Sequence, residues 1–139
     1  MYRRILIASD GSEGAGRALS AAIDLAKRHE AELHMVCVEE LPRFPATMDE
    51  VIEETEAAND RFARVIEHGR ALAASRHVTL QTHVIAGHVV SSIVDFIERN
   101  GYDLLVVGFM GHSALYNRMI GSTTDRLVEL APCAVLVVK

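Results

Sequence analysis

Three glycines and two hydroxyl residues near the end of the chain could bind phosphate groups. Gly108 and Gly111 follow an apolar stretch, and Gly121 stands directly before Ser122 and Thr123. Glycine lets a backbone approach an anion closely. Gly121 would open a helix whose first amides are unpaired and carry the positive end of the helix dipole, and the two hydroxyls add donors there. The spacing predicts a cradle for phosphate oxygens.

The same segment also permits a purely structural interpretation. Gly108 and Gly111 could simply shape the turn that follows a strand. Ser122 could be an ordinary N-cap, with Asp125 completing a capping box. Capping and phosphate binding use the same amides, so the spacing alone leaves both interpretations open.

The elements around this segment alternate between strand and helix patterns. Strands are predicted at 4–8, 33–38, 78–84, 104–107 and 134–138, and helices at about 15–26, 51–73, 89–97 and 122–131. Such alternation predicts an α/β fold with parallel crossovers and a single doubly wound five-stranded sheet. Continuously apolar strands such as LLVVG and AVLVV fit a sheet covered on both faces. One domain spanning 1–139 is expected.

Ligands of such sheets bind beyond the carboxyl ends of the strands, where the strand order reverses. The exits of the first, second and fourth predicted strands therefore matter most. The first exit reads Ala8-Ser9-Asp10-Gly11, and either Asp10 or Ser12 could cap the helix that follows. The second exit is Val38-Glu39-Glu40, and the third begins at Gly108.

Composition narrows the possible partners. The formal net charge is −5 and no basic block interrupts the chain, which argues against nucleic acid as a partner. No apolar run approaches the ~20 residues that a membrane span requires, and the first is too short for a signal peptide. Cys37 and Cys133 lack metal-site spacing, as do the seven histidines, of which His34 and His83 fall in strand patterns. We expect a cytoplasmic protein.

Three segments together resemble the universal stress protein family over the whole chain. They are the opening ILIASDGSEGAGRAL, the spacing G-x2-G-x9-G-S that begins at Gly108, and the closing APCAVLVVK. The resemblance implies a flavodoxin-like or Rossmann-like three-layer sandwich with strand order 3-2-1-4-5. Family members are usually dimeric, and those with the glycine motif intact bind ATP.

The resemblance assigns a nucleotide role to nine positions. Gly108, Gly111, Gly121, Ser122 and Thr123 would hold the phosphates and ribose; Asp10 would lie near the adenosine or a bound Mg²⁺; Ala8 and Val38 would contact the adenine through backbone groups; and His112 follows the second glycine. Ala8 replaces a frequent family proline. His112 replaces a frequent Arg or Lys, which predicts weaker or pH-dependent phosphate affinity.

Other nucleotide-binding classes fit poorly. The glycines after Asp10 lack the GxGxxG spacing of a dinucleotide site, and no GxxxxGK[ST] motif is present. A receiver domain would carry an aspartate after the third strand, where Ile85-Ala86-Gly87 stands. We expect an ATP-binding regulatory protein with little or no ATPase activity and no catalytic residue. The alternative is a slow ATP hydrolase or phosphotransferase of the same fold.

The last predicted strand implies a homodimer. With the family's strand order, Ala134–Val138 lies at the edge of the sheet and reads Ala-Val-Leu-Val-Val. An apolar edge needs a cover, and antiparallel pairing with the same strand of a second copy would supply one. The rival possibility is that the long second helix or the chain terminus covers this edge.

Overall fold

The computed structural model of the protein describes residues 1–40, 47–109 and 119–139, and in them five strands alternate with four helices. In chain order these are β1 (Arg4–Ala8), α1 (Glu13–His29), β2 (Glu32–Glu40), α2 (Met48–Ser75), β3 (Leu80–Gly87), α3 (Val89–Asn100), β4 (Leu104–Gly108), α4 (Ser122–Leu130) and β5 (Ala134–Val138). The predicted alternation is confirmed, and the first and last predicted strands match the observed ones residue for residue.

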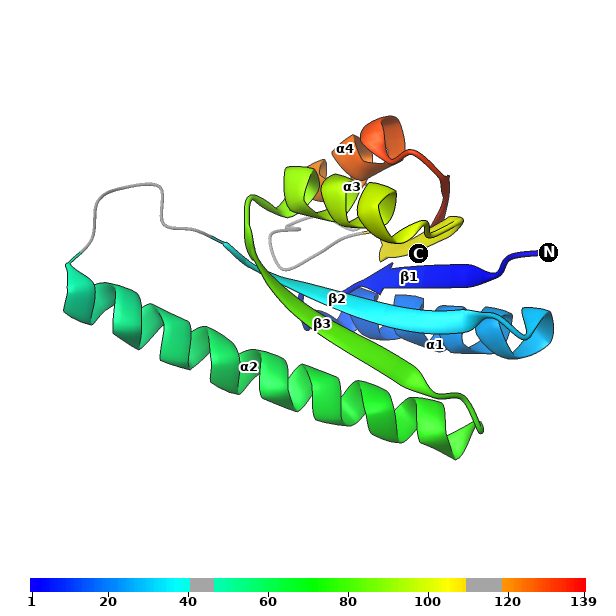
Figure 1. Ribbon diagram of the computed structural model, residues 1–139, viewed down its shortest axis with the longest axis horizontal. Helices are drawn as coiled ribbons and strands as arrows, with labels where there is room; N and C mark the ends of the chain where they lie inside the picture. The colour runs from blue at the N-terminus through cyan, green and yellow to red at the C-terminus, as the bar shows by residue number, and fades with distance from the viewer. Residues whose placement is uncertain (41–46, 110–118) are drawn as a thin grey trace.

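The strands form one parallel sheet in the order β3-β2-β1-β4-β5, as predicted. Helices α1 and α2 cover one face of the sheet, and α3 and α4 cover the other (Figure 1). The chain first builds outward from β1 to β3 and then returns to place β4 on the other side of β1. The strand order therefore reverses between β1 and β4.

The central strand explains why both faces need helices. Ile5, Leu6 and Ile7 of β1 are all completely buried. Ile5 and Ile7 belong to the core beneath α1 and α2, whereas Leu6 belongs to the core beneath α3 and α4. Because successive side chains of a strand point to opposite faces, an unbroken apolar run can be buried only in a three-layer sandwich.

Local capping fixes where the first three helices begin or end. Ser12 is the N-cap of α1, and its hydroxyl accepts the N–H of Ala15 at 3.2 Å, so a capping box built on Asp10 is not formed. Helix α2 begins earlier than its apolar pattern predicted because Thr47 and Glu50 form a capping box. Gly101 ends α3 as a left-handed C-cap with a φ of 67°.

A long-range carboxylate contact fastens the start of β1. The Asp103 side chain accepts the backbone N–H groups of Arg3 and Arg4 at 2.8 and 3.1 Å. Arg3 and Asp103 are 100 residues apart in the sequence. The first strand of the chain is thus held by the segment that leads into the fourth.

Among the described residues, no helix is both long enough and apolar enough to cross a membrane.

Candidate nucleotide site

The two ends of the glycine segment lie side by side at the carboxyl end of β4. The N–H of Gly121 donates to the carbonyl oxygen of Phe109 at 2.9 Å, and the hydroxyl of Thr124 donates to the carbonyl oxygen of Gly108 at 2.7 Å. Thr124 is buried. Two glycines separated by 13 positions in the sequence are therefore brought together beside the point where the strand order reverses. In this fold class, that is the usual position of a ligand site.

Helix α4 begins without a side-chain cap. Gly121 is its N-cap, with φ −63° and ψ 148°, and within the described part of the chain no side-chain cap hydrogen bond is formed. The interpretation of Ser122 as an ordinary N-cap is therefore wrong: Ser122 is the first helical residue. Ser122 and Thr123 are both exposed. Among the described residues, the first amides of α4 are therefore not capped by a side chain.

The exits of β1 and β2 lie next to this region in the sheet. Ala8 ends β1 and Val38 lies two residues before the end of β2, and both are half-buried. Strand β1 is hydrogen-bonded to β2 on one side and to β4 on the other. Asp10 is exposed, and its carboxylate accepts the N–H of Ser12 at 2.9 Å in the turn that opens α1. The structure thus places Ala8, Asp10 and Val38 toward the carboxyl ends of the strands, on the same side of the sheet's strand ends as Gly108 and Gly121.

Two further predicted residues, Gly111 and His112, lie outside the residues that the structure describes. Within the described ranges, no group of three His, Cys, Asp or Glu side chains could hold a metal ion. Asp10 alone offers one carboxylate.

The structure gives Gly108 a packing role that the sequence did not reveal. A Cβ atom built on Gly108 would lie 2.9 Å from the carbonyl carbon and 3.0 Å from the carbonyl oxygen of Gly14. It would also lie 3.2 Å from the backbone nitrogen of Ala15. The close approach of α1 to the end of β4 therefore requires glycine at this position, independent of any ligand.

We therefore expect Gly108→Ala to lower the free energy of unfolding by ~1–3 kcal/mol, because backbone atoms of α1 must shift to admit the methyl group. Thermal denaturation without nucleotide measures this. The control is Gly16→Ala in α1, where an added Cβ meets nothing within 4 Å and the better helix propensity of alanine stabilises by up to ~1 kcal/mol. A Gly108→Ala protein as stable as the wild type would contradict the packing role.

The structure also brings two cationic side chains, Arg61 and Lys139, toward the carboxyl ends of the strands, and the sequence pattern did not single them out. Arg61 of α2 and Asp10 both act electrostatically on the buried Cys37, whose pKa is raised to about 11 mainly by burial. Val65, one turn further along α2, lies against Gly11. The ammonium group of Lys139 lies 5.3 Å from the centre of the Phe109 ring. Both cations come from distant parts of the chain, so only the folded arrangement reveals them.

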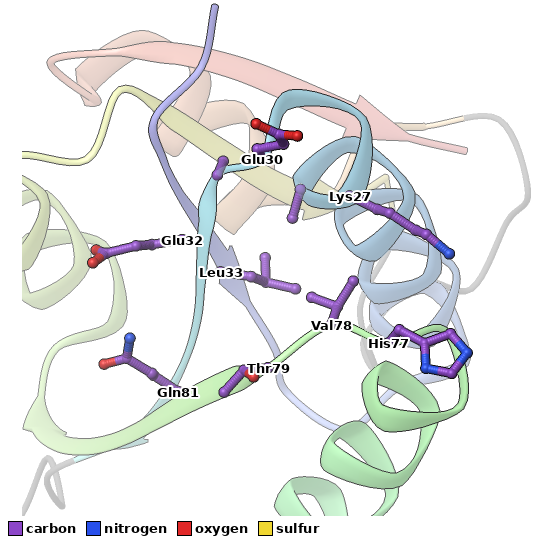
Figure 2. A pocket seen from close by; sticks show the side chains of 10 residues that line it. Lys27, Glu30, Glu32, Leu33, His77, Val78, Thr79 and Gln81 are labelled. Carbon is purple, nitrogen blue, oxygen red and sulfur yellow. The ribbon is translucent and has the colours of Figure 1, made fainter.

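A groove of about 420 Å³ lies at the amino ends of the strands, opposite the glycine segment. It is formed where α1 ends and where β2 and β3 begin, and Figure 2 shows Leu33 and Val78 pointing into it. Glu30 and His77 border it, each with a left-handed backbone conformation that reverses the chain after a helix. Since the groove lies at the amino ends of the strands, it is separate from the glycine segment.

Comparison with known proteins agrees with this geometry. The model of the universal stress protein family matches residues 1–139. A universal stress protein of Methanocaldococcus jannaschii is 30% identical over 141 residues, which covers all of this chain and 83% of the relative. The structure of UspA from Lactobacillus plantarum matches with a TM-score of 0.88 and 26% identity, covering 99% of this chain and 98% of that one.

Two further solved structures carry nucleotides. A universal stress protein in complex with cAMP matches with a TM-score of 0.77 and 23% identity, covering 99% of this chain and 97% of that one. The universal stress protein from Archaeoglobus fulgidus in complex with dAMP matches with a TM-score of 0.68 and 22% identity, covering 99% and 98%. At these identities the likeness concerns the fold, and the nucleotides belong to those proteins.

Proposed function

Since the chain belongs to the universal stress protein family, we propose that it is an ATP-binding regulatory protein whose nucleotide lies between the ends of β1, β2 and β4 and the start of α4. One observation carries the proposal. The hydrogen bond from Gly121 to Phe109 joins the two ends of the glycine segment beside an uncapped helix N-terminus. The relatives in complex with cAMP and dAMP support an adenine nucleotide as the ligand.

Each predicted residue has a defined part in this proposal. Ser122 and Thr123 receive the phosphates through their backbone N–H groups and hydroxyls at the start of α4, and Gly121, whose own N–H donates to Phe109, leaves space for the phosphates there. Ala8 and Val38 offer backbone groups to the adenine. Asp10 lies near the adenosine or a Mg²⁺ ion that accompanies ATP. Gly108, Gly111 and His112 complete the phosphate segment in the way that the family resemblance implies.

The direct test is calorimetric titration of the purified protein with ATP, ADP, AMP and cAMP, together with analysis of any nucleotide that copurifies. We expect ATP to bind more tightly than AMP, because the β- and γ-phosphates add contacts to the start of α4. Absence of binding by all four nucleotides would refute the proposed function. Equal affinity for ATP and AMP would be consistent with an adenine site but would contradict the proposal that α4 binds the β- and γ-phosphates.

The alternative of a slow ATP hydrolase makes a quantitative prediction. Phosphoryl transfer requires an oriented nucleophile and cations placed against the transferred phosphate, whereas the proposed contacts are backbone amides, hydroxyls and one carboxylate. We expect a turnover far below ~1 per second, the lower end of the ordinary enzyme range, in a phosphate-release assay with Mg²⁺. Faster turnover would make the protein an enzyme, with Asp10, Arg61 and His112 the first residues to substitute.

We further propose that the partner is a second copy of the chain, paired through β5. The strand lies at the open edge of the sheet. Leu136 on β5 and both Val128 and Leu130 on α4 are large apolar residues with 37–48% of their surface exposed. Helix α2 does not cover this edge, because it packs against β2, β3 and α1 on the other side of the sheet (Figure 1). Antiparallel pairing of two β5 strands would cover the apolar edge.

A further inference from the structure

Two histidines on neighbouring strands form a pair beneath α3. Nδ1 of His34 on β2 lies 2.9 Å from Nε2 of His83 on β3, and the two rings are nearly parallel. His34 is only 4% exposed. Phe96 of α3 lies edge-on to His83, and Tyr102 lies edge-on to His34. The pair therefore sits between edge strand β3, its neighbour β2 and the helix that covers them.

The distance between the two rings constrains their protons. At 2.9 Å, one nitrogen must donate and the other must accept. The other nitrogen of His34, Nε2, is buried and forms no hydrogen bond among the described residues, but it lies 3.5 Å from a carboxylate oxygen of Glu32. That oxygen is held at 2.8 Å by the side chain of Arg4. A carboxylate favours N–H over a lone pair, so neutral His34 carries its proton on Nε2 and accepts at Nδ1 from His83.

This tautomer allows the pair to take one proton but not two. A proton added to the free Nδ1 of His83 leaves the hydrogen bond between the rings intact. A proton added to Nδ1 of His34 would set two N–H groups against each other at 2.9 Å. Two interacting groups of this kind share their titration, so the midpoints belong to the pair.

The surroundings oppose even the first proton. Burial is the main cause that lowers the pKa of both His34 and His83, and the positive charge of Arg4 lowers both further. Glu32 acts in the opposite sense on His34. The rings that α3 and the following turn supply, Phe96 and Tyr102, bring no compensating charge, since burial raises the pKa of Tyr102 above its usual 10. Asp103 is committed to the backbone of Arg3 and Arg4.

We propose that His34 and His83 form an acid sensor that holds edge strand β3 against α3 and loosens this edge at low pH, because the detached strand can bind more protons than the closed pair. While β3 is packed against α3, which we call the closed edge, both histidines bind protons less readily than after β3 has detached. The closed edge is therefore fully stable above about pH 6.5, the ordinary midpoint of histidine, and loses stability as the pH falls below it. The device does not require nucleotide, so it stands apart from the proposed ATP site.

The first test needs no variant. Long-range proton–nitrogen NMR spectra of the histidine rings, recorded from pH 8 to pH 4.5, follow each imidazole separately. We expect His34 as the Nε2–H tautomer at pH 8, and a linked transition of His34 and His83 with a midpoint below 6.5. Two independent transitions near 6.5, or the opposite tautomer of His34, would overturn the proposal.

The second test measures the opening of the edge. Amide exchange in β3, corrected for the intrinsic exchange rate at each pH, reports how often this strand detaches. We expect protection of β3 to fall about tenfold per pH unit below pH 6.5 for each extra proton that the open state binds, while β1 changes little. His83→Gln keeps a donor for His34 and removes one titrating group, so it should flatten the pH dependence.

The matched control is His68→Gln, which removes an exposed histidine of α2 and should leave the β3 profile unchanged. If protection of β3 in the wild type does not vary with pH beyond that of β1, the pair is not a sensor. The same conclusion follows if His68→Gln and His83→Gln flatten the profile equally. Should His83→Gln fail to fold, the ring titration of the wild type still decides.

Discussion

Replacement of Gly121 with valine should abolish ATP binding while the protein remains folded. The φ of −63° and ψ of 148° at Gly121 lie in a region that valine adopts freely, so the backbone itself does not require glycine. A valine side chain would instead occupy the space before the first amides of α4. We expect the affinity for ATP to fall at least ~100-fold, equivalent to about 2.7 kcal/mol.

The measurement is calorimetric titration of wild type and variant, with circular dichroism and thermal denaturation to verify the fold. Valine is a weaker N-cap than glycine, so a loss of stability of about 1 kcal/mol is expected. The control is Ser122→Ala, which removes one hydroxyl but leaves the amides open and should weaken ATP by no more than about tenfold. Unchanged ATP affinity in a folded Gly121→Val protein would refute the assignment of phosphates to α4.

Replacement of Val137 with proline should convert the proposed dimer into a monomer. The carbonyl oxygen of Val138 accepts the N–H of Phe109 at 2.9 Å, so the backbone groups of Val138 face β4. The backbone groups of neighbouring residues point to opposite sides of a parallel strand, which directs those of Val137 and Val135 toward the open edge. Proline at 137 therefore removes an edge-facing N–H while sparing the ladder between β4 and β5, and an edge strand tolerates proline at such a position.

Two-fold symmetry doubles this loss, because each copy carries the substitution. We expect the dimer dissociation constant to rise ~100-fold or more, measured by light scattering across a dilution series. Val137→Ala is the matched control: it trims the side chain but keeps the edge N–H, so a weakened dimer should persist. A wild-type protein that is monomeric at micromolar concentration would remove the interface, and a dimer unaffected by Val137→Pro would place it elsewhere.

Local patterns predicted the order and type of the elements because each pattern reports on a few neighbouring residues. The predicted strands at Arg4–Ala8 and Ala134–Val138 match the observed strands. The apolar pattern predicts that helix α2 starts near Val51, whereas the structure begins it at Met48. Residues 48–51 are all exposed, so this first turn adds nothing to the apolar face from which the prediction was made. The capping box of Thr47 and Glu50 lengthens the helix, and this signal was present in the sequence.

The rest depended on which strands become neighbours. The packing of Gly108 against Gly14 requires α1 to cross the end of β4, and no local pattern states that crossing. His34 and His83 are 49 positions apart and meet only through the register of β2 and β3. The sequence could place each in a strand but could not predict their pairing. The family resemblance supplied the strand order, and with it the neighbours of β1.

The position of β1 has a consequence for how the chain is made. Strand β1 is synthesised first, yet its fully buried residues Ile5, Leu6 and Ile7 lie at the centre of the sheet between β2 and β4. Asp103, which fastens its start, follows Arg3 by 100 residues, a delay of roughly 5–20 s at ordinary translation rates. During that interval the nascent sheet has an apolar open edge on β1. A ribosome stalled before β4 would therefore present the apolar edge of β1 to other chains, where strand pairing could begin aggregation.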